Sequence, residues 1–255
     1  MVYHAGNIVV KVAENKEEFN RNCAVSIMEQ IKRKPDSVLS FATGGTPIGV
    51  YKELVTLHKG GRADFSMITS FNLDEYYPIR KADPQSYHAY MHEHLFDHVN
   101  IDKSRINIPD GEAEDAAEEC SAYEAKIRMA GRIDYQIMGI GANGHIGFNE
   151  PGDEFPRSTH LVALKDSTIQ ANARFFDSVD AVPRTAITMG IKTIMGARKI
   201  LLLATGRAKA AAVKNALFGP ITPALPASAL QLHPRVMVVL DRDAASELLK
   251  TLGDH

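Results

Sequence analysis

The sequence predicts an α/β fold in which helices cover both faces of a mostly parallel sheet. Short apolar segments rich in β-branched residues alternate with amphipathic segments of helical length along most of the 255 residues. Such alternation is typical of parallel strands joined by helices, because each crossover places a helix against a face of the sheet. The chain contains no internal repeat, low-complexity tract or linker, so we expect residues 1–255 to form a single domain.

The expected strands are short and largely aliphatic. The segments 200–204 and 236–240, for example, are apolar throughout, as strands that are buried on both faces are. In chain order, the expected strands are residues 7–12, 37–42, 67–73, 133–140, 200–204 and 236–240.

The expected helices lie between these strands and are amphipathic. In the first of them, Phe19, Cys23 and Ile27 recur on one side at the spacing of an α-helix. The chain is less regular between residues 141 and 199. In chain order, the expected helices are residues 16–34, 46–59, 84–99, 113–130 and 207–218, and a last one begins at Ala244.

Composition and charge exclude several classes of protein. The chain has 45% hydrophobic and 24% charged residues, and its formal net charge of −2 comes from interspersed acidic and basic side chains. It has neither a basic patch for nucleic acid nor an apolar run near the roughly 18 residues of a membrane span. The N-terminus lacks the features of a signal peptide. We therefore expect a cytoplasmic protein with no nucleic-acid or membrane partner, and with reduced thiols at Cys23 and Cys120.

Chemically unusual segments follow four of the expected strands. They are residues 43–46, 74–75, 141–150 and 205–209. In parallel sheets ligands bind beyond the carboxyl ends of the strands. We therefore expect these four segments to meet at one crevice.

The first segment, Thr43-Gly44-Gly45-Thr46-Pro47, joins a strand to a helix. Its glycines allow backbone N–H groups to approach an anion, and the helix N-terminus adds a favourable dipole. Thr46 is the expected N-cap, with Pro47 at the first helical position. A tight turn that binds nothing is the alternative.

The segment 205–209 repeats this arrangement, with a glycine turn followed by a helix whose first turn carries Lys209. The helix dipole opposes a cation at this place unless an anion lies between them. The segment therefore indicates a second part of an anion site, although a solvated lysine fits the pattern equally well.

Asp74 and Glu75 place adjacent carboxyl groups at the end of a strand. Neighbouring residues on a strand face opposite ways, so one carboxyl group is expected in the crevice and the other behind it. A carboxylate in the crevice would serve as a general base for a carbon-bound proton. Helix capping or a surface position is the alternative for either residue.

The segment Gly139–Pro151 contains four glycines around His145. Glycine disfavours order, so this density indicates a backbone that must approach another group closely. A histidine titrates near neutrality and exchanges protons with oxygen atoms. Asn143 and Glu150 flank His145 and are expected to orient its ring and set its tautomer.

Taken together, residues 40–47, 72–76 and 141–151 closely resemble the glucosamine-6-phosphate deaminase (glucosamine-6-phosphate isomerase) family, and residues 170–176 and 230–234 fit it too. The resemblance spans almost the whole chain. It implies a Rossmann-like sheet with a mobile lid segment. It also implies an aldose–ketose isomerisation with deamination, which converts glucosamine 6-phosphate to fructose 6-phosphate and ammonia.

The resemblance also implies a role for each site residue. Asp74 would move a proton between C2 and C1, and His145 would open the pyranose ring at its oxygen. Asn143 and Glu150 would be the partners of His145. The phosphate would be bound by two loops and by the mobile segment, through Thr43, Gly44, Gly45, Thr46, Lys209 and Arg174.

This chemistry requires neither a metal ion nor an organic cofactor, so we expect none. Four histidines between residues 88 and 98 resemble a metal cluster, but they do not share one helix face and no carboxylate or thiolate at suitable spacing completes the set. A solvated helix face is the better interpretation.

Three other functions fit parts of the sequence. Galactosamine 6-phosphate differs from the expected substrate only at C4, which these motifs do not contact. A non-catalytic sugar-phosphate sensor would keep the phosphate loops but would not need Asp74 and His145, both of which are present. A lactonase of the related 6-phosphogluconolactonase type would share the glycine loop without the full set of motifs.

The resemblance also bears on regulation. Many members carry Asp where this chain has Asn143, so the charge beside His145 differs between members. Some members are activated by an amino-sugar phosphate at a subunit boundary. His160 and Val162 stand where those members carry basic residues, and the chain stops early at His255, so we expect a non-allosteric enzyme. A homo-oligomer and either direction of flux are compatible with the sequence.

Overall fold

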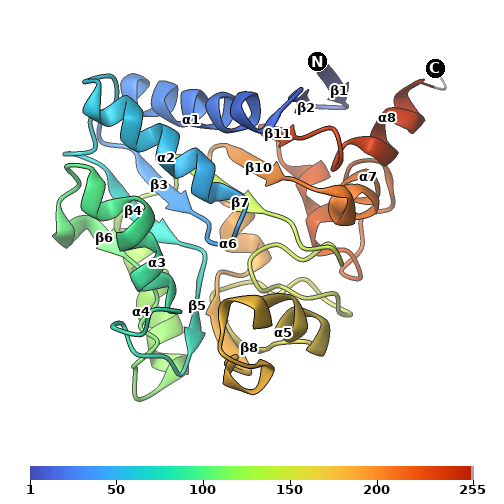
Figure 1. The fold of residues 1–255 in the computed structure, drawn as a ribbon. Helices are drawn as coiled ribbons and strands as arrows, with labels where there is room; N and C mark the ends of the chain where they lie inside the picture. The colour runs from blue at the N-terminus through green and yellow to red at the C-terminus, as the bar shows by residue number, and fades with distance from the viewer. Residues whose placement is uncertain (254–255) are drawn as a thin grey trace.

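The computed structural model describes residues 1–253 and is built around an eight-stranded sheet (Figure 1). In chain order the strands of this sheet are β1 (Val2–Ala5), β2 (Ile8–Val12), β3 (Val38–Phe41), β4 (Thr69–Asn72), β6 (Ile106–Asn107), β7 (Tyr135–Gly139), β10 (Ile200–Ala204) and β11 (Val236–Leu240). Their order across the sheet is β1-β2-β11-β10-β7-β3-β4-β6. All neighbours are parallel except the β1–β2 hairpin, so the predicted mostly parallel α/β sheet is confirmed.

The helices pack on both faces of this sheet, as the sequence predicted. In chain order they are α1 (Lys16–Arg33), α2 (Pro47–Lys59), α3 (Tyr87–His94), α4 (Ala116–Met129), α5 (Asp166–Asn172), α6 (Ile191–Met195), α7 (Ala210–Phe218) and α8 (Ser246–Gly253). Short 3₁₀ helices are η1 (Phe96–His98), η2 (Lys103–Arg105), η3 (Ala173–Phe175), η4 (Val179–Ala181), η5 (Arg207–Lys209) and η6 (Pro226–Leu232).

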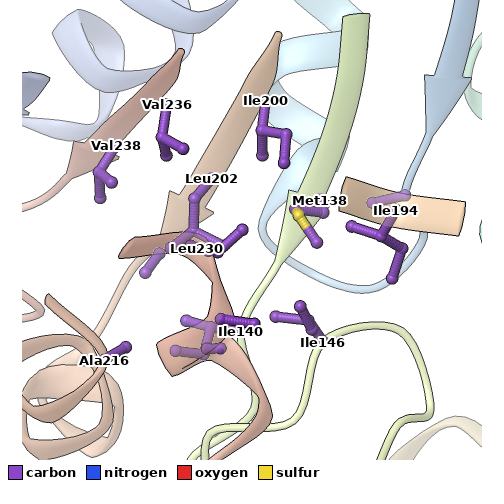
Figure 2. Close-up of a cluster of buried hydrophobic side chains, with 14 of the residues drawn as sticks. Met138, Ile140, Ile146, Ile194, Ile200, Leu202, Ala216, Leu230, Val236 and Val238 are labelled. Carbon is purple, nitrogen blue, oxygen red and sulfur yellow. The ribbon is translucent and has the colours of Figure 1, made fainter. Parts of the chain in front are cut away.

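Two apolar layers, one on each face, hold the central strands in place. Strand β10 is buried along its whole length and alternates its side chains between the layers. Leu202 lies in the layer shown in Figure 2, together with Met138 and Val238 from the neighbouring strands. Leu201 lies in the opposite layer, beneath α1 and α2, which lie side by side in Figure 1. Burial on both faces explains why these strands are apolar throughout.

A second, three-stranded sheet was not predicted. It consists of β5 (Asp74–Tyr77), β9 (Thr185–Thr188) and β8 (His160–Ala163), in the order β5-β9-β8 with antiparallel neighbours. A small apolar cluster that includes Tyr76, Phe148 and Ile169 packs this sheet against α5. Because β5 follows β4 after a single residue, the chain passes from the large sheet directly into the small one.

Several predicted boundaries were wrong. The helix expected over residues 84–99 begins at Tyr87, because the Ser86 hydroxyl accepts the backbone N–H of Ala89 at 3.0 Å, and its α-helical part ends at His94. Thr46 occupies the N-cap position of α2 with Pro47 next, as predicted, but it has helical backbone angles and its side chain makes no capping hydrogen bond. The first strand, β1, was missed.

Two predictions about this fold, the mobility of one segment and the extent of the domain, stay predictions. The lid segment expected around Arg174 corresponds to α5, η3 and η4, and its mobility stays a prediction. The single-domain boundary at residue 255 also stays a prediction, because residues 254–255 lie outside the described part of the chain. Within residues 1–253, no helix has the length and hydropathy to span a membrane.

Candidate active site

Strands β3, β4, β7 and β10 end at the same edge of the large sheet, where a cavity of about 580 Å³ opens. The predicted crevice is therefore present in the structure. All of the predicted site residues except Glu150 line it, namely Thr43, Gly44, Gly45, Thr46, Asp74, Asn143, His145, Arg174 and Lys209. Glu150 lies behind His145 and contacts it from within the protein.

Asp74 lies at the point where the chain leaves the large sheet for the small one. Asp74 is only 7% exposed, and it lines the cavity. Burial, and then the charge of Glu75, raise the pKa of the Asp74 carboxyl group to about 8. A carboxyl group of this kind gains and loses a proton near neutral pH, which is the behaviour required of a general base.

Glu75 faces away from the cavity and binds the start of helix α3. Its Oε1 accepts the backbone N–H groups of Tyr76 at 2.9 Å and Tyr87 at 2.8 Å, and its Oε2 accepts that of His88 at 2.9 Å. A carboxylate is favourable at a helix N-terminus. Burial raises the pKa of Glu75, and these N–H groups partly offset the rise. The two adjacent carboxyl groups therefore divide the expected functions between them, one in the cavity and one as a helix cap.

His145, Asn143 and Glu150 form one cluster in the loop after β7. The side chain of Asn143 donates to Glu150 Oε2 at 2.7 Å, and the backbone N–H of His145 donates to Asn143 Oδ1 at 3.1 Å. His145 Nδ1 lies 3.5 Å from Glu150 Oε2. A carboxylate that faces Nδ1 favours a proton on that nitrogen, which leaves Nε2 to exchange a proton with a ligand.

The Glu150 carboxylate is held ionised behind the imidazole. Burial raises its pKa, but contacts with His145, Thr168 and Asn143 outweigh burial and hold the pKa below its ordinary value. Its Oε1 accepts a short hydrogen bond from the Thr168 hydroxyl on α5. Glu150 therefore supplies a negative charge beside His145, although Asn143 itself is neutral.

Two glycines of this loop are required by close approach. A Cβ at Gly141 would overlap the imidazole ring of His145. Gly147 has φ +56°, and a Cβ there would lie 2.8 Å from Thr188 Oγ1 and 3.5 Å from Asp74 Oδ2. The glycine density noted in the sequence thus allows the backbone to pass against both proton-transfer groups.

The opposite end of the cavity carries two cations. Arg174 reaches across from η3, so that its Nη2 lies 4.0 Å from where a Cβ of Gly45 would be. Burial, and then the charge of Arg174, lower the pKa of Lys209. Two close cations repel each other, and a bound anion would relieve that repulsion. Thr46 joins the two glycine turns, because its Oγ1 is hydrogen-bonded to Thr205 Oγ1 at 3.0 Å.

Among the polar residues that line the cavity, sequence reasoning missed Tyr87, Ser167, Thr168 and Asn172. Tyr87 occupies the first turn of α3, and the Ser86 cap is the sequence signal that would have placed it there. Thr168 and Asn172 lie on α5, a helix of seven residues that is too short to show a helical pattern. Asn172 Nδ2 donates to the Tyr76 hydroxyl at 2.9 Å.

Among residues 1–253, no group of three or more His, Cys, Asp or Glu side chains is arranged to hold a metal ion. Of the histidines near α3, His92 is instead paired with Asp97 Oδ1 at 2.8 Å.

Comparisons with known proteins show the family to which the chain is related. Residues 13–239 match the model of the glucosamine-6-phosphate isomerases/6-phosphogluconolactonase family. The glucosamine-6-phosphate deaminase of Halothermothrix orenii is 54% identical over 239 residues, covering 94% of this chain and 99% of that protein. The deaminase of Clostridium botulinum is 54% identical over 237 residues, covering 93% and 97%.

Solved structures show the same relationship. A monomeric glucosamine-6-phosphate deaminase superimposes with a TM-score of 0.91 at 48% identity, covering 93% of this chain and 99% of its own. The 6-phosphogluconolactonase of Thermotoga maritima has a TM-score of 0.74 at 20% identity, covering 92% of this chain and 99% of its own. The latter similarity concerns the fold alone.

Gly141→Ala should displace the His145 ring, because the added methyl group would occupy its place. The expected result is a shift of the His145 ring resonances in NMR spectra and an altered cavity. Gly152→Ala is the matched control in the same loop, since its Cβ would meet only Glu150 O at 3.8 Å. Unchanged His145 resonances in Gly141→Ala would contradict the close approach.

Asp74→Asn should stabilise the fold increasingly as the pH rises. Burial raises the Asp74 pKa from 3.8 to about 8, so between these values the unfolded chain has lost a proton that the folded chain retains. The free energy of unfolding of the native protein therefore falls as the pH rises through this window. In Asp74→Asn this contribution to the fall is absent. Thermal unfolding of both proteins from pH 5 to 8 measures the difference, with the exposed Asp153→Asn as control. A difference independent of pH would refute the raised pKa.

Proposed function

Because the chain belongs to the glucosamine-6-phosphate isomerase/6-phosphogluconolactonase family, we propose that it converts glucosamine 6-phosphate and water to fructose 6-phosphate and ammonia. The family predicted from the motifs is confirmed, and identity to deaminases extends over nearly the whole of both chains. The chain is therefore an enzyme of amino-sugar metabolism.

One observation carries the proposal at the level of chemistry: a single cavity combines two proton-transfer groups with a pair of cations. The buried carboxyl group of Asp74 and the imidazole of His145 are the proton-transfer groups. Arg174 and Lys209 are the cations. A phosphorylated sugar that must be opened and then isomerised requires all of these groups at once.

His145 would begin the reaction by opening the pyranose ring. It transfers a proton to the ring oxygen as the C1 hydroxyl loses one, which yields the open-chain aldehyde. Glu150 stabilises the positive charge that the imidazole carries during this exchange. Asn143 holds the Glu150 carboxylate in place through the 2.7 Å hydrogen bond.

Asp74 would then move the proton between carbon atoms. In the aldehyde the C2 proton is acidic, and the carboxylate removes it while the carbonyl oxygen O1 takes up a proton, which gives an enolamine. Return of the proton to C1, with loss of one from the amino group, gives the imine of fructose 6-phosphate, to which water adds at C2 as ammonia leaves. The raised pKa of Asp74 suits both steps, because the group must accept a proton and release it again.

The phosphate would bind at the cationic end of the cavity. The Thr43–Thr46 turn presents backbone N–H groups, and Lys209 and Arg174 supply charge-assisted hydrogen bonds. The net charge of the chain is −2, so local groups of this kind must capture the anionic substrate.

The other functions are less well supported. A lactonase shares the fold at 20% identity, whereas the deaminases share 54% of their residues with this chain. A sensor would not need Asp74 or His145. Galactosamine 6-phosphate remains the alternative substrate, because no residue described above distinguishes the C4 epimers.

Three further expectations stay predictions. They concern action in the cytoplasm, a possible homo-oligomer and the absence of allosteric activation. One solved relative is monomeric, and sedimentation of this chain would establish its own state. His160 and Val162, on which the non-allosteric prediction depends, lie on β8 of the small sheet.

The direct test is release of ammonia from glucosamine 6-phosphate and galactosamine 6-phosphate, assayed in parallel. We expect turnover of the gluco epimer. Asp74→Asn keeps the shape of the side chain but should lower kcat by roughly 10²-fold or more, the usual scale for loss of a general base. No ammonia from either sugar would refute the proposed function, and near-normal turnover by Asp74→Asn would refute the role of that residue.

Lys209→Ala should raise KM by about 10- to 100-fold, since a charge-assisted hydrogen bond contributes roughly 1.5–3 kcal/mol. Free glucosamine should be a very poor substrate of the native enzyme for the same reason. Lys214→Ala, on α7 but outside the cavity, is the matched control and should leave KM unchanged. An unchanged KM in Lys209→Ala would contradict the anion site.

A further inference from the structure

Helix α5 and the turn η3 contact three parts of the cavity. Thr168 donates to Glu150, which faces His145. Asn172, one turn further along, donates to the hydroxyl of Tyr76, which lies on β5 with Asp74. Arg174 follows in η3, at the cationic end. One short segment therefore contacts Glu150 behind His145, the strand that carries Asp74, and the cationic part of the cavity.

The orientation of Glu150 depends on this segment. Its two carboxylate oxygens have different partners: Asn143, from its own loop, binds Oε2, whereas Thr168 binds Oε1. The Glu150 side chain is 6% exposed and Thr168 is 5% exposed, so water does not readily replace the Thr168 hydroxyl. Movement of α5 would leave Oε1 without this donor and would allow the carboxylate to turn away from His145.

Helix α5 depends in turn on its contacts. It has seven residues, and its N-cap residue Lys165 makes no capping hydrogen bond through its side chain. A helix this short is not stable in isolation, so tertiary contacts determine its position. One of these is Ile169 in the small apolar cluster. A phosphate bound by Arg174 would add a charged contact at the other end of the segment.

We infer that Thr168 is a positioning residue, which couples the binding of phosphate at Arg174 to the orientation of the Glu150 carboxylate. The inference rests on the proposed function. A bound phosphate would then do more than raise the affinity for the substrate. Its contact with Arg174 would also stabilise the segment that orients Glu150 beside His145, the residue that opens the ring. The phosphate thereby contributes to kcat as well as to KM.

The test compares two substitutions at this position. Thr168→Val keeps the shape of the side chain and removes the hydroxyl group, so kcat for glucosamine 6-phosphate should fall by roughly 10- to 100-fold. Because coupling is reciprocal, the inhibition constant of inorganic phosphate should also rise in Thr168→Val, and Thr168→Ser should return it close to the native value. Thr168→Ser retains the hydroxyl group and should restore most of the native kcat. Gln170→Ala, at an exposed position of α5, is the control for the helix itself.

A double-mutant cycle with Glu150→Ala separates positioning from general loss of structure. If Thr168 acts through Glu150, then Thr168→Val should have little further effect on kcat once the carboxylate is absent. Native kcat in Thr168→Val, failure of Thr168→Ser to restore it, or additive effects in the cycle would each overturn the inference. A native chain that releases no ammonia would overturn the proposed function as well, so the two failures are distinguishable.

Discussion

Two adjacent carboxyl groups, of Asp74 and Glu75, are buried at the junction of the two sheets. Their burial costs free energy, and the contacts that offset this cost determine how the site is arranged. An unpaired carboxylate is costly to bury. Glu75 offsets this cost with three backbone N–H groups, and in doing so it fixes the start of helix α3. Within residues 1–253 no comparable set of donors faces Asp74, and burial, followed by the charge of Glu75, makes its carboxyl group retain a proton to higher pH. The same burial therefore yields one carboxyl group that caps a helix and one that gains and loses a proton near neutral pH.

The order of the parallel strands determines which other loops line the cavity. Strands β3, β7 and β10 bring the two glycine turns and the histidine loop to the edge at which Asp74 lies. Helix α5 then covers this edge from the side of the small sheet (Figure 1). The rigid sheet thus supplies most of the reactive groups, while a short peripheral segment supplies Arg174 and the contacts to Glu150.

Local patterns allowed much of this arrangement to be predicted. Strand β10 is apolar along its whole length, and the glycines around His145 mark a backbone that passes against other groups. The small sheet could not be predicted in this way, because Asp74 pairs with Thr188, far along the chain, and its strands lack a clear alternation. Thr46 fits the pattern of an N-cap, but its hydroxyl binds Thr205 instead, a tertiary contact that local propensity cannot reveal.

The order of strands also affects how the chain assembles during synthesis. Strand β11, from residues 236–240, lies between β2, from residues 8–12, and β10. The first hairpin emerges early but cannot join the sheet until nearly the whole chain has been made. Contacts of such high sequence separation slow folding, and until β11 arrives both β2 and β10 present open edges. Strand β2 therefore lacks one of its two neighbours for most of translation, whereas β10 lacks β11 only during its last part.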